Sequence, residues 1–203
     1  AGRRAQSHLR ALARYRERFQ AIERVDFFGS AGRDRVASLL TALESTRGAP
    51  NQRAAGGGAD GAQFKGLLWV TRPRPGVDRM SSAWLIRRFI DPTATFGFIT
   101  DAKNAPADAV PFDMYGAGFG HEGDRCTFET LVAAFAIQDG AVTRLGEVVH
   151  NLDLKDGKFA APEAVTLGAA IDGLQLSCAD DHQLLDQGVI LFEAMYRSFS
   201  QHA

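Results

Sequence analysis

The chain has 203 residues, of which 45% are hydrophobic, and its formal net charge is −1 at pH 7. This length suits one sizeable domain, and no apolar run approaches the ~20 residues that cross a bilayer, so we expect no membrane-spanning segment and no membrane partner. Two cysteines do not make a disulfide framework, and the amino terminus shows no secretory signal, so we expect a cytoplasmic protein with reduced thiols.

Basic residues are concentrated at the front of the chain. Residues 1–64 hold eleven Lys or Arg and six Asp or Glu, a balance of +5, whereas the remaining residues have a balance of −6. A basic front end indicates either a nucleic-acid partner such as DNA, an acidic partner, or the solvated face of a helix.

The front of the chain is predicted to form a short helical segment, residues 1–47. Apolar residues near the 3.6-residue period predict one helix over about 7–24 and a second helix after Gly32. Residues 48–64 are rich in Gly and Ala and lack periodicity, which is typical of a linker. The main domain should therefore comprise residues 65–203.

The main domain opens with strands and one helix. The apolar run over 66–71 predicts a buried strand, and the two prolines within 72–75 interrupt it. A helix is expected over 78–91, where the following proline ends it. Residues 95–100 have the composition of a second strand, and residues 101–125 are rich in Gly, Pro and Asp and predict a long loop.

Helices are predicted for the rest of the chain. Periodic apolar residues indicate helices over 126–137 and 141–152, a further helix beginning at Pro162, and a last helix over 181–199. The fold class is therefore α+β: a predominantly helical domain with a small β-sheet, preceded by the short helical segment.

Several carboxylates occupy positions where the helical pattern expects an apolar residue. They are Asp78, Glu129, Asp153 and Asp181. A buried carboxylate is costly unless it is paired or binds a metal. His121, in a Gly-flanked loop eight residues before Glu129, would add an imidazole, and this oxygen-rich set suits a divalent ion such as Mn, Fe, Mg or Zn.

Structural roles are the alternative for each of these residues. Asp78 can cap its own helix, Asp153 can end its helix in a turn, and His121 can bond a loop carbonyl. Asp180 is predicted as a helix cap, because it begins the D-x-x-Q pattern of a capping box. Cys126 has the character of a small buried hydrophobe.

Five arginines surround the Pro-rich loop and the helix that follows it. They are Arg72, Arg74, Arg79, Arg87 and Arg88, and their guanidinium groups would suit an oxyanion. Adjacent helical positions diverge by about 100°, so either Arg87 or Arg88 is expected in solvent. No GxGxxG or Walker loop is present, so hydride transfer with a nucleotide cofactor is not indicated.

The candidate residues belong to a set of short motifs whose order is kept over about residues 66–199. The motifs are Trp69-Val-Thr-Arg-Pro-Arg-Pro75, Asp78-Arg79, Trp84-Leu-Ile-Arg-Arg-Phe-Ile-Asp-Pro92, Pro111-Phe-Asp113, His121-x-Gly123-x-x-Cys126-Thr-Phe-Glu129, Asp153, Ala161-Pro-Glu-Ala164 and Ala179-Asp-Asp181. This set resembles the chromate resistance protein ChrB family, chiefly its carboxy-terminal domain, and residues 1–47 resemble the end of that family's amino-terminal region. Ser82 stands where the family usually has a cysteine, which counts against a redox role, and Val149–Leu152 also departs from the family pattern.

The resemblance implies a protein that accompanies chromate efflux. We expect His121, Glu129 and Asp153 to bind a divalent metal ion, namely Mn, Fe or Zn. If the protein is an enzyme, a metal-dependent hydrolase or lyase is expected, with Asp78 and Arg79 as catalytic residues.

A small anionic ligand is the expected partner of the remaining site residues. Arg72, Arg87 and Asp181 are predicted to bind it, and chromate or the carboxylate or phosphate of a substrate would fit this chemistry. The alternative function is a chromate-responsive transcriptional regulator without a catalytic step, which would bind DNA through its basic front end.

Overall fold

The computed structural model describes residues 61–201, together with Tyr15 and Val36, which are both helical. The chain divides into two compact units, Ala1–Pro50 and Asn51–Ala203. The two helices predicted within residues 1–47 lie, apart from Tyr15 and Val36, outside the described residues. The predicted domain boundary stays a prediction, but the end of the predicted linker, Gly61–Phe64, forms the short 3-10 helix η1.

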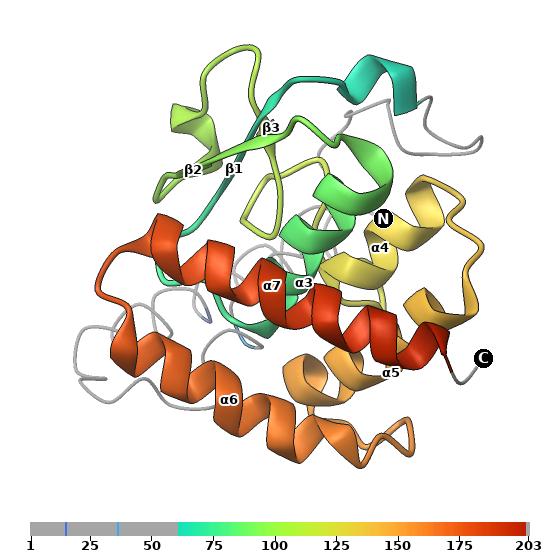
Figure 1. Ribbon diagram of the computed structural model, residues 1–203. Helices are drawn as coiled ribbons and strands as arrows, with labels where there is room; N and C mark the ends of the chain where they lie inside the picture. The colour runs from blue at the N-terminus through green and yellow to red at the C-terminus, as the bar shows by residue number, and fades with distance from the viewer. Residues whose placement is uncertain (1–14, 16–35, 37–60, 202–203) are drawn as a thin grey trace, which may run out of the picture. The chain divides into compact units, whose positions relative to one another are not determined.

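A small parallel sheet forms one side of the second unit (Figure 1). The central strand β1 (Leu68–Thr71) pairs in parallel with β2 (Thr95–Phe98) and with β3 (Val110–Pro111). The first two strands were predicted. The segment 101–125, which was predicted as a long loop, also contains β3 and the short 3-10 helix η3 (Ala102–Asn104).

The helix predicted over 78–91 is present in two parts. Helix α3 (Val77–Leu85) continues directly into η2 (Ile86–Ile90), a single π-helical turn. The N–H of Asp91 donates to the carbonyl of Ile86 at 2.7 Å, which closes the wider turn. The proline at the next position cannot donate a backbone hydrogen bond, so the helix ends there, as predicted.

Four further helices confirm the α+β fold class. They are α4 (Thr127–Ala134), α5 (Gly140–Leu154), α6 (Glu163–Ser177) and α7 (Asp181–Ser200). The predicted cap at Asp180 is confirmed, because its carboxylate accepts the N–H of Gln183 at 2.8 Å. Within the part of the chain that the structure describes, none of the helices has the length and apolarity that crossing a membrane would require.

Helix α3 lies in the middle of the helical layer and contacts both α4 and α7, while α5 contacts α6 and α7 (Figure 1). Gly188 of α7 allows the close approach of α3, because a Cβ at this position would lie 2.5 Å from Cγ of Met80. Trp84 of α3 is buried, and its indole N–H donates to Glu193 of α7 at 2.9 Å. These contacts hold the first turn of α3, which carries Asp78, in a fixed place.

An aromatic cluster packs against the sheet and includes the last residue of η1. The ring of Phe64 lies 5.8 Å from that of Trp69 on β1 and 5.1 Å from that of Phe135 at the end of α4. Trp69 in turn contacts Phe112, which follows β3. The core of the domain therefore begins inside the segment that the sequence predicted as a linker.

Asp91 fastens the end of η2 to the start of β1. Its carboxylate accepts the N–H groups of Gly66 at 2.8 Å and Leu67 at 3.0 Å, and it also bonds the hydroxyl and N–H of Thr93 and the indole of Trp69. Burial alone would raise the pKa of Asp91, but these donors outweigh it and hold the pKa below its usual range. The carboxylate form is therefore the one that stabilises the fold.

We expect Asp91→Ala to lower the free energy of unfolding at pH 7 by about 3 kcal/mol, because several buried donors lose a charged acceptor. The folded-state pKa is depressed, so this stabilisation is present above the ordinary carboxyl pKa and is lost as the pH falls below it. Urea unfolding of wild type and variant at pH 7 and at pH 3 should therefore show a smaller difference in acid. An equal difference at both pH values would contradict this account, and Asp91→Asn is the shape-matched control.

Candidate metal centre

The candidate site lies at the carboxyl ends of the parallel strands, the edge at which ligands bind in many parallel sheets. Arg72 follows β1 directly, and Asp113 lies two residues after β3. The two side chains meet, with Nη2 of Arg72 3.5 Å from Oδ2 of Asp113. The loop after Arg72 leads into α3, whose first turn adds Asp78 and Arg79.

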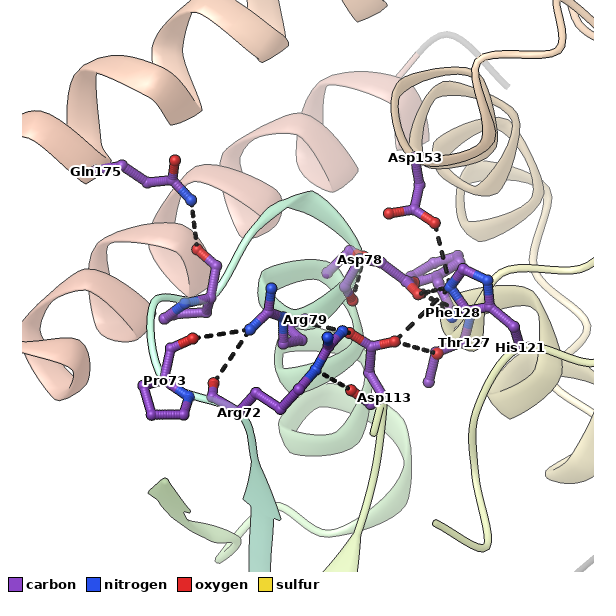
Figure 2. Close-up of polar contacts among 12 residues, drawn as sticks. Arg72, Pro73, Asp78, Arg79, Asp113, His121, Thr127, Phe128, Asp153 and Gln175 are labelled. Carbon is purple, nitrogen blue, oxygen red and sulfur yellow. Dashed lines mark hydrogen bonds and ion pairs between the residues drawn. The ribbon is translucent and has the colours of Figure 1, made fainter. Parts of the chain in front are cut away.

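Three carboxylates surround one imidazole nitrogen at this edge (Figure 2). Nε2 of His121 lies 3.1 Å from Oδ2 of Asp78, 3.2 Å from Oδ2 of Asp153 and 3.7 Å from Oδ1 of Asp113. We call these four residues the aspartate–histidine cluster. They come from α3, from the segment after β3, from the loop before α4 and from the last turn of α5, so only the complete fold assembles them.

Asp78 is buried and joins α3 to α4. Its Oδ2 accepts the N–H of Thr127 and its Oδ1 accepts the N–H of Phe128, both at 2.8 Å. These are the first two residues of α4, whose unpaired N–H groups and positive end favour a carboxylate. The alternative that Asp78 caps its own helix is wrong, since it caps the neighbouring helix instead, and Gly76 stands at the start of α3 without a side-chain cap.

The charges of the cluster shift its protonation equilibria. Burial alone would lower the pKa of His121, but hydrogen bonds and charge from Asp153 and Asp78 raise it to about 11. Burial alone would raise the pKa of Asp78, yet His121 and the N–H groups of α4 hold it below its usual range. Without a metal, the imidazolium of His121 therefore offsets the charges of Asp78 and Asp153.

Asp113 connects the cluster to two arginines, and sequence reasoning missed it as a site residue. Its Oδ2 lies 3.2 Å from Nε of Arg79 and 3.5 Å from Nη2 of Arg72, while its Oδ1 accepts the hydroxyl of Thr127 at 3.0 Å. Burial and the charge of Asp78 raise its pKa to about 6, although the arginines oppose the shift. Its φ of 45° is unusual for a residue other than glycine and is a form of strain that is common at functional sites.

The five predicted arginines do not form one site. Arg72 and Arg79 lie together beside Asp113, and we call them the arginine pair (Figure 2). Arg74 instead donates to the carbonyls of Gln175 and Cys178 near the end of α6. Arg87 pairs with Asp186 at 2.9 Å and lies over the ring of Phe96, and Arg88 faces Glu193 and the ring of Tyr196.

Two other predicted site residues lie outside the cluster. Oε2 of Glu129 accepts the N–H of Cys126 at 2.9 Å and lies 2.8 Å from Nδ1 of His150 on α5. Asp181 accepts the backbone N–H of Arg74 at 3.0 Å. The predicted metal-binding role of Glu129 and the predicted ligand-binding role of Asp181 therefore gain no support from where these side chains lie.

A group of donor atoms in the cluster could hold a metal ion. Single ligand atoms of Asp78, His121 and Asp153 all lie within 4.8 Å of one another. One imidazole nitrogen with two carboxylate oxygens is a donor set that suits Mn, Fe or Zn. The side chains of His121 and Asp153 are each 24% exposed, so one side of the group is open to solvent.

The fold and the site together define an α+β domain with an ionic cluster at the carboxyl edge of a parallel sheet. Residues 69–199 match the family described as "ChrB, C-terminal domain", and the chain belongs to this family. Protein ChrB of Cupriavidus metallidurans is 36% identical over 200 residues, which cover 95% of this chain and 61% of that protein. The chain thus spans about three fifths of the length of this relative. No solved structure matches this chain.

Proposed function

We propose that this ChrB-family protein is a chromate resistance protein that binds a divalent metal ion through Asp78, His121 and Asp153. The observation that carries the proposal is the convergence of three carboxylates on one imidazole nitrogen, in a group partly open to solvent. Like charges this close repel one another unless a cation lies among them. The proposal keeps His121 and Asp153 from the sequence prediction and puts Asp78 in the place of Glu129.

The competing cation is the proton on Nε2 of His121. A bound metal would take this nitrogen's lone pair, so the proton must leave when the metal enters. Exchanging one positive charge for two would leave the cluster and the arginine pair more positive than before. This excess charge supports the second part of the proposal, an anionic ligand beside the arginine pair.

The arginine pair is suited to an anion such as chromate or the carboxylate or phosphate of a substrate. Arg72 is 35% exposed at its side chain and can meet a ligand from solvent, whereas Arg79 is 12% exposed and is held by the carbonyls of Arg72 and Pro73. Asp113 competes for both guanidinium groups, so an anion would bind against this internal carboxylate. Asp113 therefore sets how tightly the pair binds its ligand.

An enzymatic role, if present, would be that of a hydrolase or lyase. The metal would supply Lewis acidity for a substrate oxygen or for water. The arginine pair would hold the negative charge of the substrate, with Arg79 kept in place by backbone carbonyls. Asp78, held by one N–H group of α4 on each oxygen, would keep its carboxylate in one orientation.

Metal binding can be tested with wild type and single ligand variants. We expect stoichiometric Mn, Fe or Zn in wild type after loading, and a loss of at least about 100-fold in affinity in His121→Ala and Asp153→Asn, because each removes a direct ligand. Elemental analysis and chelator competition measure this. Arg87→Ala, whose side chain pairs with Asp186 away from the cluster, should bind metal as wild type does. Folded wild type that takes up none of the three metals would refute the proposal.

Anion binding can be tested by titrating chromate into the metal-loaded protein. We expect Arg72→Ala to weaken binding about tenfold, because one of two charged donors is lost, and Asp113→Asn to tighten it by a similar factor, because the competing charge is removed. Asparagine tolerates the positive φ of this position better than most residues. Arg87→Ala is again the control, and equal affinity in all four proteins would contradict a site at the arginine pair.

A chromate-responsive regulator is the second candidate, and the charge balance of +5 in residues 1–64 is the observation that favours it. In that case DNA binding should weaken steeply with added salt, because phosphate contacts release counterions. At constant salt, chromate should release the protein from DNA. Filter binding over a range of salt concentrations measures both effects. Absence of DNA affinity even at low salt would remove this candidate and leave the metal and anion proposals untouched.

A further inference from the structure

A second imidazole, that of His150 on α5, is fully buried between two carboxylates. Nδ1 of His150 is 2.8 Å from Oε2 of Glu129, and its Nε2 is 3.1 Å from Oδ2 of Asp156. The ring also meets that of Phe159 edge-on, with centroids 4.9 Å apart. We call Glu129, His150 and Asp156 the histidine bridge.

The bridge does not provide a metal site of its own. The two ring nitrogens of an imidazole point in opposite directions, so no single ion could contact the carboxylates at both ends and the ring between them. A carboxylate already faces each nitrogen, so His150 has no nitrogen left for a metal in the cluster. Its effect on the cluster must therefore act through the residues that it holds.

One end of the bridge determines how α4 begins. The oxygen of Glu129 that faces His150 also accepts the N–H of Cys126, the residue immediately before α4. The next two N–H groups, those of Thr127 and Phe128, are the donors that hold both oxygens of Asp78. His150 thus orients Glu129, and Glu129 orients the turn that binds Asp78.

The other end of the bridge secures the end of α5 and the segment after it. Asp156 lies just beyond α5, and its Oδ1 accepts the N–H of Lys158 at 3.0 Å. Lys158 in turn pairs with Asp124 at 2.8 Å, in the loop that carries His121. Asp153, the cluster residue on α5, is three positions from His150 and lies on the same side of the helix. The bridge therefore touches the supports of all three proposed metal ligands.

We propose that the histidine bridge is the positioning unit of the metal centre, and that Glu129 acts there as a positioning residue and not as a ligand. The inference rests on the proposed metal binding. It explains why a Glu, a fully buried His and an Asp lie in one hydrogen-bonded line whose end is the first turn of α4. Partners of this kind typically change metal affinity by 10–100-fold when they are removed.

His150→Leu tests the proposal, because it keeps an apolar filling for the site and removes both hydrogen bonds. We expect its affinity for Mn²⁺ and Zn²⁺, measured by chelator competition, to fall about 10–100-fold while its circular dichroism stays native. The absorption spectrum of bound Co²⁺ should also change, since the orientation of Asp78 changes. His150→Asn places an N–H near that of Nδ1, so it keeps the contact to Glu129 and should recover most of the affinity.

A control must separate the effect of a less stable protein from the effect of a displaced metal ligand. Ile90→Ala opens a cavity at the last residue of η2, at the far end of this helix from Asp78, and should destabilise the protein without changing metal affinity by more than about twofold. If Ile90→Ala weakens metal binding as much as His150→Leu, or if folded His150→Leu binds metal like wild type, the proposal is wrong. Should His150→Leu fail to fold, Asp156→Asn decides: an affinity loss of at least threefold supports the bridge, and none refutes it.

A readout without metal distinguishes this proposal from the proposed function. Amide hydrogen exchange at Thr127 and Phe128, relative to amides in the middle of α7, should be at least tenfold faster in His150→Leu than in wild type. If wild type binds no metal, the proposed function fails, and this exchange result still decides whether the bridge positions Asp78. Unchanged exchange at both amides would overturn the inference.

Discussion

The site depends on one interaction, the carboxylate of Asp78 accepting two N–H groups at the start of α4. This contact buries a charge, and the backbone donors and the positive helix end offset its desolvation. It also joins α3 to α4. Thr127 and His121 are thereby placed next to Asp113, 3.0 Å and 3.7 Å from its Oδ1. Without the acceptor, the helix would begin in the core with unpaired donors. The same two oxygen atoms therefore serve the fold and the site.

Around this contact, negative and positive side chains of the cluster and the arginine pair offset one another. Three aspartates face one histidine and two arginines, and the high pKa of His121 and the raised pKa of Asp113 are two consequences of the same crowding. Such a balance is sensitive to any added ion, because each charge lies near several others in a buried setting. The proposed metal site and the proposed anion site lie on neighbouring parts of this network, so binding of one ligand would alter the affinity for the other.

The long periodic helices and two of the three strands could be predicted from the sequence, because their apolar patterns are continuous. Strand β3 could not, since Val110 and Pro111 are too few to show alternation, and Asp113 was missed as a site residue with it. Asp78 and Asp153 were recognised as carboxylates at apolar helical positions and His121 as an imidazole in a Gly-flanked loop, and the fold brings the three together. Glu129 was grouped with His121 because the two are close in sequence. Its helix instead directs it toward α5 and His150, whose burial no local pattern reveals.

The residues of the cluster are spread over a long part of the chain, from Asp78 on α3 to Asp153 in the last turn of α5. During synthesis, the segment up to His121 would leave the ribosome well before Asp153 is available. An ion that needs all of these side chains could therefore bind only after the elements from α3 to α5 have been made and packed. Occupancy of the site would thus mark a finished molecule, and a cell's free metal would favour complete copies over partly folded ones.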